Sequence, residues 1–202
     1  MAASADLYWL PLGAGGHFVR FNGRAYETIS AALARRPACD LYHSALEIRL
    51  GPTTYAIEVA PVWNERSKFR GVVAEGAVGS RLLGRLRLFR YEVRCWPGGR
   101  IPDIAEAVGG AQRLTADPGC VERLLELIPR VPIGVWGRDE LGAGDMWNSN
   151  SVVAWLIASC GIDMDGIHPP VGGRAPGWQA GLVAAASTER GRSMARRAPL
   201  AA

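Results

Sequence analysis

The sequence has little of several features that mark common protein classes. It contains one lysine, Lys68, and only four cysteines scattered along 202 residues. No cysteine pair has the short spacing of a zinc site, so we expect no bound metal and reduced, mostly buried thiols. The longest apolar stretch, residues 152–160, is too short to cross a membrane.

The N-terminal residues lack the pattern of a signal peptide. Asp6, Pro11 and the glycine-rich stretch 13–16 interrupt the apolar residues, and no charged segment precedes an apolar run. We therefore expect a cytoplasmic protein with no membrane span.

The excess of positive charge does not indicate a nucleic-acid partner. The formal net charge is +4, but residues 183–202 hold four arginines against one glutamate, a balance of +3. The body is therefore nearly neutral and lacks a basic stripe, so we expect no nucleic-acid binding. The glycines at 13–16 lack the spacing of a dinucleotide-binding fingerprint, and we expect no cofactor.

The patterns that are present predict one α+β domain over residues 1–182. Apolar and β-branched residues on both sides of Gly51-Pro52 predict a hairpin of residues 41–50 and 53–62. We expect further strands at 7–12, 17–21, 72–78 and 86–95, and helices at 26–35, 101–108, 151–159 and after Asp117-Pro118. Residues 183–202 lack periodicity, which predicts a disordered basic tail.

The most distinctive segment is the run Trp147-Asn148-Ser149-Asn150-Ser151 at the start of the apolar helix. Unpaired backbone N–H groups and the positive end of the helix dipole stabilise negative charge there, on a nucleophile or on a substrate oxyanion. The same residue types are also the preferred helix caps, so Asn148 or Ser149 has a purely structural alternative.

His43 is the candidate base, because it lies inside an apolar strand that would hold its side chain rigidly. A turn centred on Gly51-Pro52 would pair His43 with Ala60 and place it diagonally across from Glu58, which could orient the imidazole. A structural strand histidine is the alternative, and His17 and His168 are weaker candidates for the base.

Together these segments resemble the permuted NlpC-like branch of the papain-like superfamily. There the histidine strand precedes the nucleophile helix, a glutamate follows on the second hairpin strand, and the helix begins with an Asn-Cys-Asn motif. Asn148-Ser149-Asn150 matches that motif except at its centre, as in an uncharacterised bacterial subgroup with serine in place of the cysteine. The resemblance covers about residues 41–161.

The resemblance implies an α+β fold with a small antiparallel sheet packed against the nucleophile helix. It also implies amide or ester chemistry on a small-molecule, peptide or lipid-like substrate. Ser149 would be the nucleophile, His43 the base and Glu58 the third member, with Asn148, Asn150 and Trp147 binding substrate.

Serine in the place of cysteine leaves two functions open. A serine hydroxyl is far less acidic than a thiol and must lose its proton to His43 during attack. The chain is therefore either a serine-dependent hydrolase or acyltransferase, or an inactive binding module that uses the same cleft. A third hypothesis is an interaction protein whose groove is lined by exposed Trp136, Trp147 and Trp178.

Overall fold

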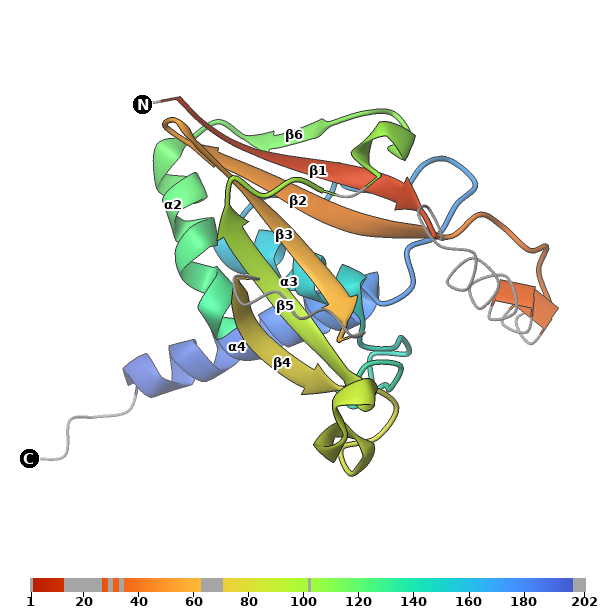
Figure 1. The fold of residues 1–202 in the computed structure, drawn as a ribbon. Coiled ribbons are helices and arrows are strands. Elements are labelled where there is room, and N and C mark those ends of the chain that lie inside the picture. Colours follow the sequence, from red (N-terminus) through yellow and green to blue (C-terminus); the bar gives the residue numbers. More distant parts are fainter. Residues whose placement is uncertain are drawn as a thin grey trace, which may run out of the picture.

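The computed structural model describes residues 2–12, 27–28, 31–32, 35–62, 71–101 and 103–197. One antiparallel sheet in this part of the chain has the strand order β4-β5-β3-β2-β1-β6 (Figure 1). Its strands are β1 (Ala3–Pro11), β2 (Tyr42–Leu50), β3 (Thr53–Pro61), β4 (Val72–Ala77), β5 (Arg90–Pro97) and β6 (Gln112–Thr115). The expected α+β class with a small antiparallel sheet is confirmed.

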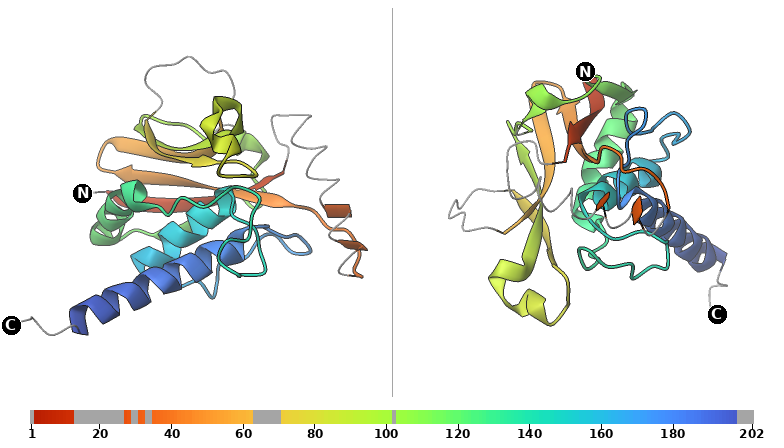
Figure 2. Two further views of the ribbon diagram at one scale, coloured as in Figure 1. Left: turned by 90° about the horizontal axis from the view of Figure 1, so that it is seen from below. Right: turned by 90° about the vertical axis from the view of Figure 1, so that its right-hand side faces the viewer.

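The longer helices lie together on one side of the sheet, as the edge-on view in Figure 2 shows. They are α2 (Pro118–Leu127), α3 (Ser149–Cys160) and α4 (Trp178–Arg197). Short 3-10 turns occur at η1 (Leu83–Arg85), η2 (Arg87–Phe89), η3 (Ile104–Glu106) and η4 (Ile128–Arg130).

The central hairpin has the predicted turn and register. β2 and β3 pair from Leu50 with Thr53 to Leu46 with Ile57 around Gly51-Pro52. The ladder ends there, whereas the pairing of β3 with β5 extends to Pro61 and that of β2 with β1 extends to Tyr42. His43 therefore lies beyond the last β2–β3 pair, and its partner across the sheet is Leu10 of β1.

The apolar helix α3 forms the centre of the core. Trp155, Leu156 and Ile157 are at most 1% exposed and pack with residues of β2 such as Leu46 and Ile48. Gly161 ends the helix in the left-handed conformation, with φ of 85°, as the sequence predicts. The apolar character all round α3 is explained by its contacts with the sheet, with α2 and with α4.

The C-terminal segment corrects one prediction, because residues 183–197 are helical rather than disordered. Helix α4 packs on α3 and buries Ala180, Ala184 and Ala185. A side chain at Gly181 would collide with the backbone of Ser151, so the glycine allows the two helices to approach closely. Small residues give a weak apolar signal in sequence, which explains why the packing face of α4 does not stand out there.

Two other expected elements are shorter than predicted. β5 begins at Arg90, and residues 86–89, expected as strand, contribute to the 3-10 turn η2. The expected helix 101–108 is reduced to η3, and residue 102 lies outside the described part. The expected strand 17–21 also lies outside it, as does most of the expected helix 26–35, of which 27–28 and 31–32 are helical.

The sheet face opposite the helices has a smaller apolar cluster of its own. It consists of Leu10, Ala45, Ala56 and Ile101. Side chains alternate between faces along a strand, so the even-numbered residues 44–48 of β2 face the helices and the odd-numbered residues 43–47 face this cluster. The alternation decides which candidate residues can meet.

Candidate functional site

The start of α3 is tied to two other segments by a buried polar cluster, here called the entrance cluster: Ser44, Asn148, Asn150 and Ser151. Asn150 is central to it and only 2% exposed. Its side-chain oxygen accepts hydrogen bonds from Ser44 N at 2.7 Å and Ser44 Oγ at 2.9 Å. Its amide nitrogen donates to the carbonyl oxygens of Tyr42 at 3.0 Å and Pro176 at 2.8 Å.

Asn148 is the N-cap residue and Ser151 completes a capping box with it. The Asn148 side-chain oxygen accepts from Asn150 N at 2.9 Å, and Ser151 Oγ accepts from Asn148 N at 2.9 Å. Asn148 also donates to Pro176 O, and Ser151 Oγ lies 2.7 Å from Gly177 O. The capping alternative is thus realised for Asn148, and both asparagine amides are engaged by the protein itself.

Ser149 is the first residue of α3 and remains half-buried. Its hydroxyl forms no hydrogen bond within the described part of the chain. It is therefore the one polar side chain between 148 and 151 that the entrance cluster does not use.

His43 points away from Ser149, because α3, which begins at Ser149, packs on the sheet face opposite to the one that His43 faces. Ser44 bonds to α3 through its side chain, so His43 faces the other way, toward the cluster that includes Leu10 and Ala45. Burial lowers the pKa of His43, although nearby Asp103 acts in the opposite direction. The structure does not bring Ser149 and His43 together.

Glu58 shares the His43 face, as the predicted register requires, but its described ion pair is with Arg94. The Glu58 carboxylate lies 3.6 Å from Arg94 Nη1, and Arg94 Nε donates to Glu92 at 2.9 Å. Glu92 is 1% exposed. Two acidic side chains therefore flank one arginine on this face, an arrangement that the sequence pattern did not reveal.

Trp147 is a buried anchor that also lines a cavity. It is 3% exposed, and its Nε1 donates to the Tyr91 hydroxyl at 3.1 Å, which donates to Gly134 O at 2.8 Å. The expected groove of exposed tryptophans is absent from the described residues. Trp136 packs against Tyr91 and Trp178 against Trp9, in tilted ring pairs with centroids 5.4 Å and 5.0 Å apart.

Two adjoining cavities are together called the groove, and Trp147 lines the smaller of them. One has a volume of about 220 Å³ and includes Trp147, Leu141 and Arg138, and the other has about 390 Å³ and includes Gly76 and Arg90. Arg81, Ile133 and Gly134 line both cavities. The groove thus runs between the β4–β5 connection and the loop that leads to α3.

The three acidic side chains of the smaller cavity bind backbone N–H groups of the protein. Asp139 accepts from Ala143 and Gly144, and Asp145 accepts from Gly177 at 2.7 Å. Glu140 accepts from Val135 at 2.9 Å and from Arg81 Nε at 2.9 Å. The bonds with Arg81 and Val135 lower the pKa of Glu140, so this carboxylate remains ionised.

The two arginines of the smaller cavity keep unused donors. Arg81 uses Nε for Glu140, and Arg138 uses Nε for the Gly79 carbonyl at 2.7 Å. Within the described ranges their terminal guanidinium nitrogens have no hydrogen-bond partner. The terminal guanidinium nitrogens of Arg81 and Arg138 are therefore donors with positive charge that a ligand in the smaller cavity could use.

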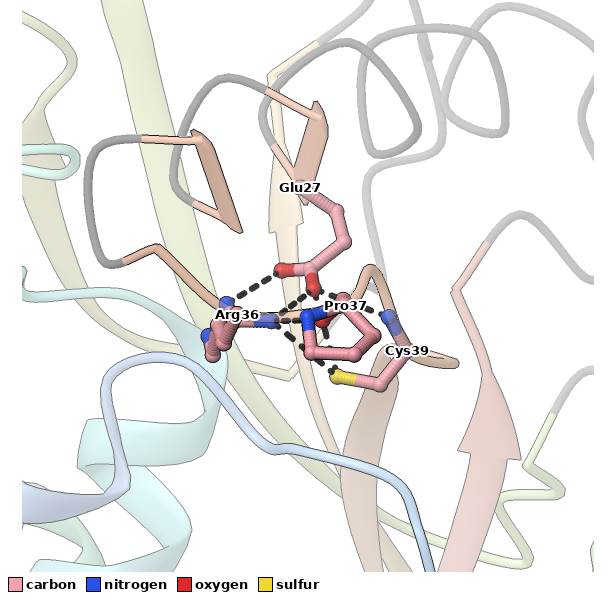
Figure 3. Close-up of polar contacts among 4 residues, drawn as sticks. All are labelled: Glu27, Arg36, Pro37 and Cys39. Carbon is pink, nitrogen blue, oxygen red and sulfur yellow. Dashed lines mark hydrogen bonds and ion pairs between the residues drawn. The ribbon is translucent and has the colours of Figure 1, made fainter.

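A second polar cluster holds the segment before β2 (Figure 3). The buried Glu27 carboxylate accepts from both terminal nitrogens of Arg36, from Cys39 N at 3.0 Å and from Cys39 Sγ at 3.2 Å. The Arg36 bond is the main cause that lowers the pKa of Glu27 to about 2. Burial and the carboxylate raise the pKa of Cys39, which disfavours a reactive thiolate.

Other sequence candidates add nothing to this site. His168 is exposed, and His17 lies outside the described residues. Within the described part, no three His, Cys, Asp or Glu side chains are grouped as metal ligands, and none of the helices there has the length and apolar character needed to cross a bilayer.

Comparison with protein-family models, curated proteins and solved structures found no match for this chain.

Proposed function

We propose that this chain is a binding module for a small amphipathic anion, with the groove as its binding site and without catalysis at Ser149. The main supporting observation is the pair of guanidinium groups, Arg81 and Arg138, whose terminal nitrogens have no hydrogen-bond partner among the described residues. The cavity around them is partly apolar, and each of its carboxylates already accepts hydrogen bonds, that of Glu140 from Arg81 itself. The order of strand, hairpin and buried helix supports a permuted papain-like origin.

The groove suits a ligand with both an apolar and an anionic part. Ile133 and Leu141 are 43% and 44% exposed and lie beside the Trp147 ring in the wall of the smaller cavity. Small-molecule sites commonly combine such apolar walls with a few directed polar groups, in volumes of roughly 300–1,000 Å³. The terminal guanidinium nitrogens would bind a carboxylate, sulfonate or phosphate.

The test uses 8-anilinonaphthalene-1-sulfonate, a fluorescent aromatic sulfonate, as the probe. We expect saturable binding by the folded protein, displaced by decyl phosphate but not by decyltrimethylammonium, which has the same chain and the opposite charge. Arg138→Ala should weaken probe binding by about tenfold or more, because one charge-assisted contact contributes roughly 1.5–3 kcal/mol.

Two variants serve as controls for this experiment. Arg130→Ala removes an exposed arginine that lies outside the groove, and Ser149→Ala removes the candidate nucleophile. Both should bind the probe as the unmodified protein does. Equal affinity in Arg138→Ala, or displacement by the cationic detergent, would exclude the groove as an anion site.

One observation favours a second candidate, a serine hydrolase or acyltransferase. The Ser149 hydroxyl is half-buried at a helix N-terminus and unpaired within the described residues, a setting that stabilises developing negative charge. This function predicts that a fluorophosphonate probe labels Ser149, and that His43→Ala prevents labelling if His43 is the base. Absence of labelling would leave the binding module as the better proposal.

A further inference from the structure

Residues 80–90, here called the tip, project beyond the ends of β4 and β5 (Figures 1 and 2). The tip carries a concentration of exposed apolar side chains that contrasts with the nearby core. They are Leu82 at 72%, Leu83 at 42%, Leu86 at 59% and Leu88 at 64% exposure. Neither η1 nor η2 contains a buried residue.

Arginines alternate with these leucines. Arg81, Arg85, Arg87 and Arg90 lie in the tip, and residues 76–91 contain no acidic residue. Arg81 pairs with Glu140 and Arg90 with Glu75, but Arg85 is exposed and has no described partner. Arg138, whose terminal nitrogens are also unpaired, bonds to the base of the tip at Gly79.

We propose that the tip docks on the surface of an anionic lipid bilayer. The leucines would enter the boundary between headgroups and acyl chains, while the arginines bind lipid phosphates. Apolar insertion combined with positive charge is the combination that holds proteins at anionic membrane interfaces. The charge of the tip matches that surface, and a neutral bilayer offers it only the apolar contribution.

Several backbone groups of the tip are already hydrogen-bonded, which suits an environment poor in water. Gly84 N bonds to Ser80 O, Arg85 N to Leu82 O, and Leu86 N to Leu83 O. Phe89 N bonds to Leu86 O, and Arg90 Nε closes the loop on Gly84 O at 2.6 Å. The tip can therefore present its leucines without first exchanging these backbone bonds.

The test is co-sedimentation of the full chain with vesicles of 3:1 phosphatidylcholine and phosphatidylglycerol, and with phosphatidylcholine alone. We expect binding to the anionic vesicles that decreases with added salt, and little binding to the neutral ones. The double variant Leu82→Ser with Leu88→Ser should reduce binding by about tenfold or more, and Arg85→Glu should reduce it several-fold.

Matched controls replace equivalent residues elsewhere on the surface. Val171→Ser alters a fully exposed apolar residue, and Arg130→Glu alters an exposed arginine on the described surface. Both should bind vesicles as the unmodified chain does, and all variants should keep their melting temperature.

Two results would overturn the proposal. One is failure of the unmodified chain to bind anionic vesicles at low salt, and the other is unchanged binding by the Leu82→Ser/Leu88→Ser variant. Self-association that the double leucine variant abolishes, without vesicle binding, would assign the tip to a second copy instead. The groove is tested separately, because none of these variants changes a groove residue.

Two cysteines in different helices lie in contact with each other. Cys120 Sγ in the first turn of α2 lies 3.0 Å from Cys160 Sγ at the end of α3, and both thiols are free. Cys160 is 4% exposed and Cys120 is half-buried. Burial and Cys120 raise the pKa of Cys160 to about 12.

We infer that these thiols form a disulfide by exchange with an oxidised low-molecular-weight disulfide such as glutathione disulfide. The Cys120 thiolate attacks one reagent sulfur and releases one glutathione thiolate. Cys160 then loses its proton, attacks the Cys120 sulfur and releases the second. Two protein thiols are oxidised, and one reagent disulfide is reduced to two thiols.

Peptide mapping after incubation with glutathione disulfide and alkylation tests this inference. We expect a Cys120–Cys160 cross-linked peptide and a higher melting temperature that a reductant reverses. Cys120→Ser should abolish both effects, whereas Cys95→Ser should leave them intact. A stable glutathione adduct on Cys120, or alkylation of both thiols after treatment, would overturn it.

Discussion

The entrance cluster and the tip differ in how completely their side chains are paired. In the entrance cluster, Asn148, Asn150 and Ser151 are buried and hydrogen-bonded to β2 and to the 176–177 segment. In the tip, four leucines are exposed beside arginines. A motif that resembles an active site therefore stabilises the fold, whereas a segment that resembles an ordinary strand leaves its side chains available to a partner.

The largest expected effect follows removal of the central side chain of the entrance cluster. Asn150→Ala leaves the buried Ser44 N–H and Tyr42 carbonyl without partners, and each such group costs roughly 1–3 kcal/mol. We expect the free energy of unfolding to fall by about 3 kcal/mol, measured by urea denaturation. Ser149→Ala is the matched control and should stay within about 0.5 kcal/mol of the unmodified protein. A similar free energy of unfolding for Asn150→Ala and Ser149→Ala would contradict the structural role of Asn150.

A smaller effect is expected at Tyr91, which connects Trp147 to the groove wall at Gly134. Tyr91→Phe leaves two buried polar groups unpaired and should destabilise the protein by about 1–2 kcal/mol. Burial raises the pKa of Tyr91 from 10.0 to about 12. The folded state therefore resists ionisation, and its stability should decrease as pH rises from about 10 to 12. The decrease should be smaller in Tyr91→Phe when denaturation is measured across that range.

The Glu27 carboxylate makes the stability of the protein depend on pH in the acidic range. Its pKa is lowered from 4.5 to about 2, so the folded state favours the carboxylate. The resulting stability is fully present above about pH 4.5 and is lost as pH falls toward 2. Glu27→Gln should lower the melting temperature by several degrees at pH 7, and the difference should narrow at low pH. Glu126→Gln, an exposed control, should show neither change.

The smallest effect is expected at the tip. Leu88 is 64% exposed, so Leu88→Ser should change the free energy of unfolding by less than about 0.5 kcal/mol. Leu124→Ala, at a buried position, should cost about 2–5 kcal/mol by comparison. A large loss of stability in Leu88→Ser would mean that Leu88 is packed in the core. The tip would then not differ from the entrance cluster in having exposed side chains.

The sequence predicted those elements whose patterns have a local cause. The hairpin follows from Gly51-Pro52 between two β-branched runs, and α2 follows from Asp117, whose carboxylate accepts from Cys120 N at 2.7 Å. Residues 86–89 alternate like a strand, but the alternation separates exposed leucines from exposed arginines instead of two sheet faces. A net charge averaged along the body likewise concealed the arginines that gather in the tip.

The candidate site was harder to predict, because it depends on contacts between distant residues. The register placed His43 and Glu58 on one face correctly, but no local pattern shows which face α3 covers. The Ser44–Asn150 bond decides that question. The Arg81–Glu140 pair of the groove likewise joins segments whose connection the local sequence does not encode.

The entrance cluster also sets an order for folding during synthesis. Asn150 is 106 residues from Ser44 along the chain, and the Asn148 and Asn150 amides require Pro176 as well. When only the hairpin has emerged from the ribosome, Asn150 is not yet available to bond with Tyr42 and Ser44 at the start of β2. Nascent chains that end before residue 176 should therefore remain sensitive to protease, and resistance should appear only after the segment around residues 176–177 has emerged.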